Sequence, residues 1–297
     1  MDSATRLYFI IARQARKAVV FRRGPSKSVR LLSWDLATDT LTGGQWFKGR
    51  LYERRCDLSP DGELLVYFAA KHHGPLGSWT AISRPPYLKA LALWPKGDGW
   101  GGGGLFDDTR TLRLNHRPGA ESHLYDGFSV PKGFRVSPLG ERPGWGEDDP
   151  IHSLRLMRDG WRIVSDGETS GYRRKGPFLW TYETPAVMDK ALGAAKARLR
   201  VSLHGIGARR GAWYNQTAQV VGVADEVLAD LGPIDWADID PNGDILLARD
   251  GCLYRLPWPR ATEPVLVADL GGMTFEPCAA PGFAAGWPKA ARVPGGR

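Results

Sequence analysis

The strongest constraint on the fold is a nine-residue turn sequence that occurs twice. Residues 57–65 read DLSPDGELL and residues 238–246 read DIDPNGDIL, and the two copies agree in residue type at every position except the third. Proline presets φ at the first central position of a turn, Asp or Asn suits the next, and Gly adopts the left-handed conformation that reverses the chain. Each copy continues into an apolar run, so both predict a hairpin of two antiparallel strands.

Further hairpin signals occur between the two copies, at irregular intervals within the range of a blade-type repeat. The 37 glycines, 22 prolines and 12 tryptophans favour tight turns, short strands and large aromatic packing groups. Near the end of the chain, DWADIDPNGDILLARDGCLYRLP (residues 235–257) contains three short strands, and PVLVADL (264–270) supplies a fourth. Residues 235–270 therefore predict one complete four-stranded antiparallel sheet.

The segment VRLLSWDLATDTL (residues 29–41) alternates large apolar residues and ends its strand in Trp34-Asp35. It resembles the third strand and following turn of a Trp-Asp repeat blade, and the Ser-Pro-Asp-Gly turn follows where the next blade places it. The resemblance implies an all-β fold, a β-propeller of four-stranded antiparallel blades, with five irregular blades favoured. Because there is one Trp-Asp dipeptide and no Gly-His signature, the number of blades and the subfamily stay open.

Two segments depart from the strand pattern. PAVMDKALGAAKARLR (residues 185–200) has apolar residues at helical spacing, a proline at its start and basic residues in its last turn, so it predicts an inserted amphipathic helix over 186–200. The Pro/Gly/Ala-rich segment 280–297 predicts a disordered tail. We therefore expect a single propeller domain over residues 1–279.

The overall composition indicates a cytoplasmic protein with no membrane association. The three cysteines are widely separated, so they suggest neither a disulfide framework nor a zinc site. The apolar run near the N-terminus, residues 7–11, is too short for a signal peptide or a membrane span. A net charge of +8 suits an anionic partner, but the basic residues are scattered as pairs, so nucleic-acid binding is not favoured.

The second copy of the turn also suggests a metal site. Asp238, Asp240 and Asn242 have the opening ligand spacing of an EF-hand calcium loop, followed by Gly243. The pattern then fails, because Arg249 stands where the bidentate glutamate belongs. A turn between two strands explains the same residues without calcium or another divalent cation, and we favour that interpretation.

A long connection follows the first copy of the turn. Residues 71–94 separate two strand patterns by more than an ordinary hairpin loop, and long loops in compact domains are often functional. Aromatic and Arg side chains bury much area with few torsions to freeze. The segment therefore predicts either a proline-stiffened surface loop without a ligand or a partner-binding patch that contains His72, His73, Trp79, Arg84 and Tyr87.

Three classes of function are compatible with these features. The first is a non-enzymatic propeller scaffold whose loops recognise another protein, and we favour it by analogy with the fold. The second is a metal-assisted hydrolase or lyase with its site at the central channel. The third is non-specific nucleic-acid binding through a basic surface. No local catalytic motif occurs, so the sequence predicts no catalytic residue and leaves enzymatic activity undecided, with a preference for none.

Overall fold

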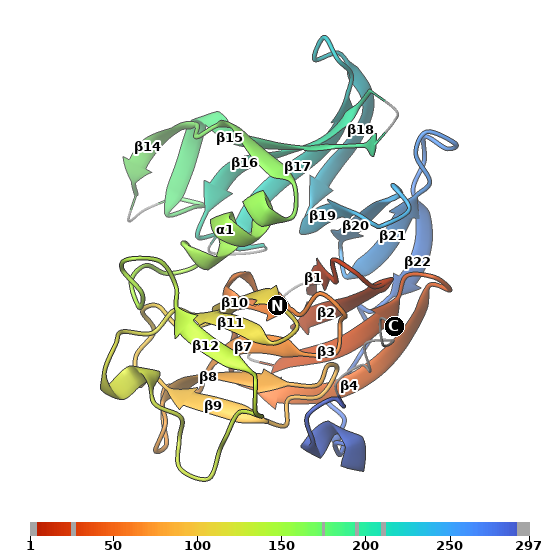
Figure 1. Cartoon of the computed structure of the whole chain (residues 1–297). Helices are drawn as coiled ribbons and strands as arrows, with labels where there is room; N and C mark the ends of the chain where they lie inside the picture. Colours follow the sequence, from red (N-terminus) through yellow and green to blue (C-terminus); the bar gives the residue numbers. More distant parts are fainter. Residues whose placement is uncertain (1–4, 25–27, 174–175, 194–195, 209–211, 290–297) are drawn as a thin grey trace, which may run out of the picture.

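The computed structural model describes residues 5–24, 28–173, 176–193, 196–208 and 212–289, which form five β-sheets in chain order (Figure 1). The first sheet comprises β1 (Arg6–Ile11), β2 (Lys17–Arg23), β3 (Ser28–Asp35) and β4 (Thr40–Lys48). The second comprises β5 (Arg50–Leu51), β6 (Asp57–Leu58), β7 (Leu65–Ala70), β8 (Ser78–Ser83) and β9 (Ala92–Pro95), and both β5 and β6 pair with β7. The third comprises β10 (Gly104–Asp108), β11 (Thr111–Leu114) and β12 (Arg135–Pro138).

The fourth sheet is the largest, with β13 (Trp161–Ser165), β14 (Glu168–Tyr172), β15 (Trp180–Ala191), β16 (Arg198–Ile206), β17 (Tyr214–Val221) and β18 (Val227–Ile234). The fifth comprises β19 (Trp236–Ile239), β20 (Ile245–Arg249), β21 (Cys252–Leu256) and β22 (Val265–Asp269). Strand pairs are antiparallel, except that β11 and β12 are parallel. One α-helix, α1 (Ile151–Arg158), and the 3-10 turns η1 (Glu53–Arg55), η2 (Ala120–Ser122) and η4 (Gly282–Ala285) complete the described elements. The expected all-β class is confirmed.

Both copies of the repeated turn form the predicted hairpins. Gly62 and Gly243 have φ of 74° and 88°, and their N–H groups donate to the carbonyl oxygens of Ser59 and Asp240 at 2.8 and 2.9 Å. The flanking strands pair as β6 with β7 and as β19 with β20. The four-stranded sheet expected over residues 235–270 is present with the order β19-β20-β21-β22.

The Trp-Asp segment also has the expected local structure. It forms β3, the third strand of the first sheet, and its turn leads into β4. The Trp34 ring is fully buried, and its Nε1 donates to Oδ1 of Asp39 at 3.0 Å. Asp35 accepts the N–H of Ala37 at 2.8 Å, which shapes the turn that follows the strand.

The helix predicted over residues 186–200 is wrong. Residues 180–191 form β15, and β16 begins at Arg198. Gly193 has a φ of 52° and the N–H of Leu192 donates to the carbonyl of Ala197, so the described ends of this segment form a hairpin; residues 194–195 lie outside the described part. Asp189 of β15 pairs with Arg198 and Arg200 of β16. These cross-strand ion pairs and the buried side chains of β16 override the helical spacing.

The segment predicted to be a disordered tail has two parts. Residues 280–289 are described and contain η4, with Ala284 fully buried and the Trp287 ring 5.1 Å from that of Phe134. Residues 290–297 lie outside the described part. The division of the chain into one domain and a tail stays a prediction.

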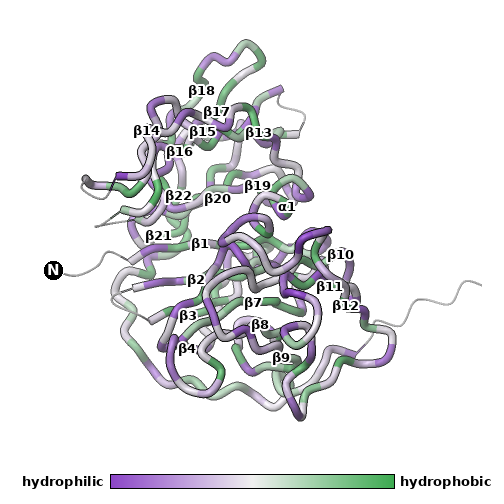
Figure 2. The backbone as a smooth tube through the Cα atoms, turned by 90° about the vertical axis from the view of Figure 1, so that its left-hand side faces the viewer, coloured by the Kyte–Doolittle hydropathy of each residue, from purple (hydrophilic) through white to green (hydrophobic). Residues whose placement is uncertain are grey.

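Buried apolar side chains connect the sheets. One cluster includes Phe9 of the first sheet, Leu65 of the second, Leu199 of the fourth and Leu247 of the fifth, and a second joins the second and third sheets. Figure 2, viewed from the left of Figure 1, places the fourth sheet at one end, the first two sheets at the other, and α1 and the fifth sheet between them.

Candidate functional site

The segment predicted to be one long loop is divided by a strand. Residues 78–83 form β8, which separates His72 and His73 at one end from Arg84 and Tyr87 at the other. Trp79 lies within β8, half-buried, with its ring 5.8 Å from that of Phe47. The structure therefore does not bring the five predicted partner-binding residues together in one patch.

The Arg84 end of the strand is covered by the chain itself. Arg84 pairs with Glu63 at 2.8 Å, and its guanidinium lies 5.0 Å from the ring centre of Phe283. The ring of Tyr87 also lies 5.8 Å from that of Phe283. His72 and His73, at the other end, are exposed, and His72 has a left-handed φ of 58°.

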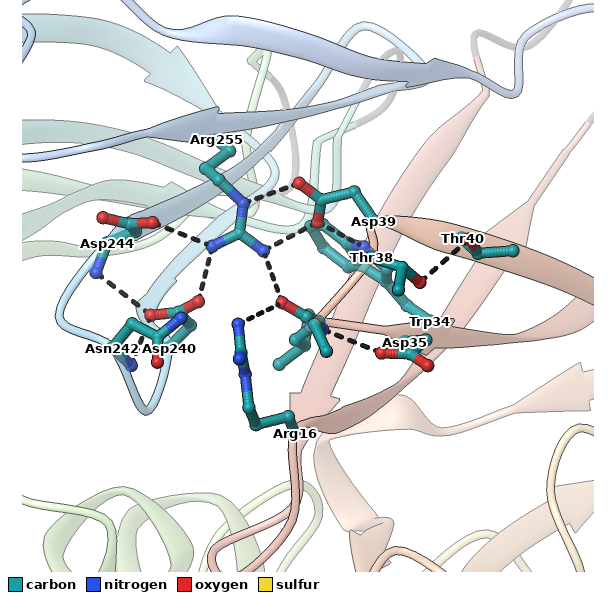
Figure 3. Close-up of polar contacts among 12 residues, drawn as sticks. Arg16, Trp34, Asp35, Thr38, Asp39, Thr40, Asp240, Asn242, Asp244 and Arg255 are labelled. Carbon is teal, nitrogen blue, oxygen red and sulfur yellow. Dashed lines mark hydrogen bonds and ion pairs between the residues drawn. The ribbon is translucent and has the colours of Figure 1, made fainter.

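The acids of the second turn are directed to different partners. Asp238 pairs with Lys190 at 2.6 Å, whereas Asp240 pairs with Arg255 at 2.5 Å (Figure 3). Asn242 is exposed and its backbone N–H donates to Oδ1 of Asp240. Within the described residues, no group of three or more His, Cys, Asp or Glu side chains is placed to hold a metal ion. Asp238 and Asp240 thus pair with different cations of the protein, and the three side chains are not directed to one point.

A cavity of about 750 Å³ lies between α1, η1 and the fourth sheet. We call it the α1 cavity. Residues 146–149, which precede α1, form part of its wall, and strands β13, β15, β16 and β17 form the rest. Its aromatic lining consists of Trp161, Trp180, Tyr182, Trp213 and Tyr214. The size and the aromatic lining are typical of a small-molecule site.

Arg54 is the principal charged group on the inner wall of this cavity. Its side chain comes from η1, is 6% exposed and stacks on Tyr214, with the guanidinium carbon 3.3 Å from the ring centre. Among the described residues, its guanidinium donates to Oε1 of Gln216 at 3.1 Å and forms no ion pair. A buried guanidinium without a carboxylate partner is unusual, because burial of an unpaired charge is costly.

Two further polar groups near Arg54 are buried without a partner. Nε2 of His152 and Nε2 of Gln216 have no hydrogen-bond partner among the described residues. Burial, and then the nearby charges of Arg54 and Arg155, hold the pKa of His152 well below its usual range, so this ring is neutral at pH 7. These two nitrogens are therefore available to a ligand or to ordered water.

A carboxylate and a tyrosine fix the wall next to Arg54. Asp148 pairs with Arg55 at 3.1 Å and accepts a hydrogen bond from the Tyr214 hydroxyl. Burial raises the pKa of Tyr214, so its hydroxyl stays protonated and acts as the donor. This network holds the ring on which the Arg54 guanidinium stacks.

The outer part of the cavity combines acidic and apolar side chains with one exposed arginine, Arg162. Glu147, Asp149 and Asp166 line it and are exposed, and Asp149 accepts hydrogen bonds from the N–H and hydroxyl of Ser153. Met157 is 50% exposed. Glu147 and Asp166 form no ion pair with described residues, so they can accept hydrogen bonds from a ligand.

Sequence reasoning did not find this site. His152 and Arg54 gave no signal because neither belongs to a local motif. Arg54 and Gln216, which contact each other, are 162 positions apart. A detectable signal was the helix itself: DPIHSLRLMRDG (149–160) combines Asp-Pro before the apolar positions with Gly160 after them.

Comparisons with known proteins give no functional assignment. No family model matches this chain, and no curated protein matches it. Among solved structures, it is similar to the uncharacterized protein lmo1340 from Listeria monocytogenes EGD-e, with 9% identity and a TM-score of 0.31, over 90% of this chain and 84% of the other. No helix of the described residues is long and apolar enough to cross a membrane. No family is therefore assigned to the chain.

Proposed function

We propose that this chain is a five-bladed β-propeller that binds an acidic sugar, a hydroxylated ring with a carboxylate, in the α1 cavity. The proposed blades correspond to the five sheets in chain order. Contacts between the ends of the chain support a closed ring: β1 packs against β19 and β20, and Asp235 accepts the N–H of Leu7 at 3.0 Å. In such a ring Arg54, which follows β5 of the second sheet, bridges to Tyr214 and Gln216 of the fourth.

The observation that carries the ligand proposal is the buried guanidinium of Arg54, which has no carboxylate partner among the described residues. A ligand carboxylate supplies the missing charge, and a charge-assisted hydrogen bond is about twice as strong as a neutral one. Gln216 donates beside it through its unpaired Nε2.

The remaining walls fit the rest of an acidic sugar. The C–H face of a pyranose ring packs on an aromatic face, whose quadrupole is negative, and Trp180 and Trp213 offer partly exposed rings. Sugar hydroxyls donate to carboxylates, and Glu147 and Asp166 stand at the outer wall. A purely apolar ligand would leave the buried guanidinium of Arg54 and Nε2 of Gln216 without a partner, which favours a polar ligand.

The experiment is a calorimetric titration with matched pairs of sugars: glucose and glucuronate, galactose and galacturonate, mannose and mannuronate. We expect one uronate to bind at least about tenfold tighter than its neutral counterpart, because one charge-assisted hydrogen bond contributes about 1.5–3 kcal/mol. Arg54→Gln should remove this preference. Trp180→Ala, a change at a partly exposed ring, should weaken binding of both members of the pair.

Trp100→Ala is the matched control, because Trp100 is 58% exposed and does not line the α1 cavity. Circular dichroism of Arg54→Gln separates lost binding from lost folding. Failure of all six sugars to bind the wild type, or an unchanged uronate preference in folded Arg54→Gln, would contradict the proposal. Recognition of a partner protein through residues 72–87 stays a separate prediction, and Phe283 covers its Arg84 end.

A further inference from the structure

A second cavity, of about 410 Å³, lies where β1, β2, β5 and the end of β7 meet. We call it the basic cavity. Four cations line it, Arg6, Arg23, Arg50 and Lys71, together with His72 and Trp213; its other lining residues are apolar or glycine. No Asp or Glu among the described residues lines it. The scattered basic residues of the sequence thus include one convergent group.

Most of this positive charge lacks a partner within the chain. Arg23 pairs with Glu53 at 2.6 Å, but Arg6, Arg50 and Lys71 form no ion pair with any described residue. The Arg50 guanidinium instead lies over the rings of Tyr52 and Trp213, at 4.5 and 5.9 Å from their centres. Three cations without an ion-pair partner around one cavity attract an anion.

Two of the cations that line the cavity, Arg6 and Arg23, repel each other. Nε of Arg6 is buried and has no hydrogen-bond partner among the described residues. Burial, and then the charge of Arg23, lower the pKa of Arg6, whereas the nearby acids Asp235 and Glu53 act in the opposite direction. An anion bound here relieves the repulsion between Arg6 and Arg23.

The number of cations and the size of the cavity narrow the class of anion. A phosphate monoester carries a charge of about −1.5 to −2 at pH 7 and has three acceptor oxygens, which suits three unpaired cations better than a carboxylate does. The volume leaves room for a further group next to the phosphate, and Trp213 offers a ring face on which a flat group can stack. We propose that the basic cavity binds the phosphate monoester of a flat-ringed small molecule, of the type of a nucleoside monophosphate.

The test is calorimetric titration of the full chain with adenosine monophosphate, inorganic phosphate and adenosine at low ionic strength. We expect the monophosphate to bind tightest, inorganic phosphate more weakly, and adenosine at least tenfold more weakly than the monophosphate. Arg50→Gln and Lys71→Gln should each weaken monophosphate binding about tenfold, since each removes a charge-assisted contact. Both residues are exposed, so neither change should unfold the protein.

Arg117→Gln is the matched control. Arg117 also lies over an exposed tryptophan, 5.4 Å from the ring centre of Trp145, but it does not line the basic cavity. The proposal is overturned if adenosine binds as tightly as its monophosphate, or if Arg117→Gln weakens binding as much as Arg50→Gln. A third contrary outcome is tight binding of an octathymidylate that Arg50→Gln leaves unchanged. That result would indicate nucleic-acid binding through a diffuse basic surface instead of the basic cavity. Lys71→Gln should leave uronate binding in the α1 cavity unchanged. The proposal for the basic cavity and the proposed function can therefore be contradicted independently of each other.

Discussion

Asp235 is a carboxylic acid at a joint between the two ends of the chain. Its Oδ2 accepts the N–H of Leu7 on β1, while the residue itself immediately precedes β19. Burial raises the pKa of Asp235 to about 7, and the hydrogen bond from Leu7 and the charge of Arg6 offset part of that rise. The carboxyl group is therefore protonated in the folded chain at pH values where it is ionised in the unfolded chain.

The pH dependence of stability should reveal this group. A pKa raised by folding gives stability that is complete below the unfolded value near 3.8 and is lost as the pH rises through about 7. Between pH 4 and pH 8, the wild type should lose free energy of unfolding relative to Asp235→Asn by a few kcal/mol, at most about 4. The amide of Asn keeps an oxygen that accepts from Leu7. Urea titrations at several pH values measure the shift.

Asp230→Asn is the control for this experiment. Asp230 is an exposed carboxylate that also accepts a backbone N–H, that of Gly232 at 3.1 Å. Its replacement should leave the pH profile close to that of the wild type. If the free energy of unfolding of Asp235→Asn depends on pH in the same way as that of the wild type, the raised pKa of Asp235 is contradicted.

At the scale of elements, α1 is held in place by the arginines of its last turn. Arg158 forms two hydrogen bonds with Asp57, at 2.7 and 3.0 Å, and Arg155 donates to the Tyr8 hydroxyl and to the carbonyl of Cys56. Asp57 is fully buried and also accepts the N–H of Phe106 on β10. One carboxylate of the repeated turn thus links the second sheet, the third sheet and the helix.

Loss of the ion pair between Arg158 and Asp57 should lower the free energy of unfolding. Arg158→Met leaves the carboxylate of Asp57 buried without its cation, so we expect a loss of about 3–5 kcal/mol in the free energy of unfolding. Chemical denaturation measures it. Arg135→Met is the control: Arg135 is 3.9 Å from Asp108 with both side chains exposed, and such pairs contribute at most about 1 kcal/mol.

A double variant separates the cost of an unpaired charge from the cost of lost packing. If the cost comes from the unpaired charge, Asp57→Asn combined with Arg158→Met should be less destabilising than the sum of the two single changes. Additive effects would instead assign the loss to packing.

The elements predicted correctly from the sequence are those set by local chemistry. Pro60-Asp61-Gly62 and Pro241-Asn242-Gly243 specify the turn through φ preferences and side-chain acceptors, whatever surrounds them. Residues 186–200 were mispredicted because Met188 and Leu192 satisfy a helical period, while the pairing of Asp189 with Arg198 and Arg200 becomes visible only once the strands are adjacent.

The candidate site was beyond sequence reasoning for a similar reason. Arg54, His152, Trp180 and Gln216 come from four elements, η1, α1, β15 and β17, and none has a motif partner near it in the chain. The His72 loop was predicted as a partner-binding patch, but β8 divides it, and His72 instead lines the basic cavity. The order of elements in space decides which side chains meet, and local patterns carry little information about that order.

At the scale of the whole molecule, the first and last sheets are joined by Arg255 of β21. Its guanidinium pairs with Asp39 in the β3–β4 turn at 2.7 Å, and with Asp240 and Asp244 of the second repeated turn at 2.5 and 3.2 Å (Figure 3). It also donates to the carbonyl of Leu36. These contacts raise the pKa of Arg255 against the effect of its burial, so the charge persists in the folded chain.

If this joint closes the proposed ring, its loss should loosen both ends of the chain together. We expect Arg255→Met to lower the free energy of unfolding by about 3–5 kcal/mol, because it leaves the fully buried carboxylate of Asp240 unpaired. Amide hydrogen exchange should accelerate in β1–β4 and in β19–β22 alike, and much less in the fourth sheet. Arg260→Met provides a matched control: Arg260 pairs with the same Asp244 at 2.7 Å but is 72% exposed, so its removal should cost at most about 1 kcal/mol. Faster exchange confined to the fifth sheet would show that the two ends fold independently and that Arg255 does not close a ring.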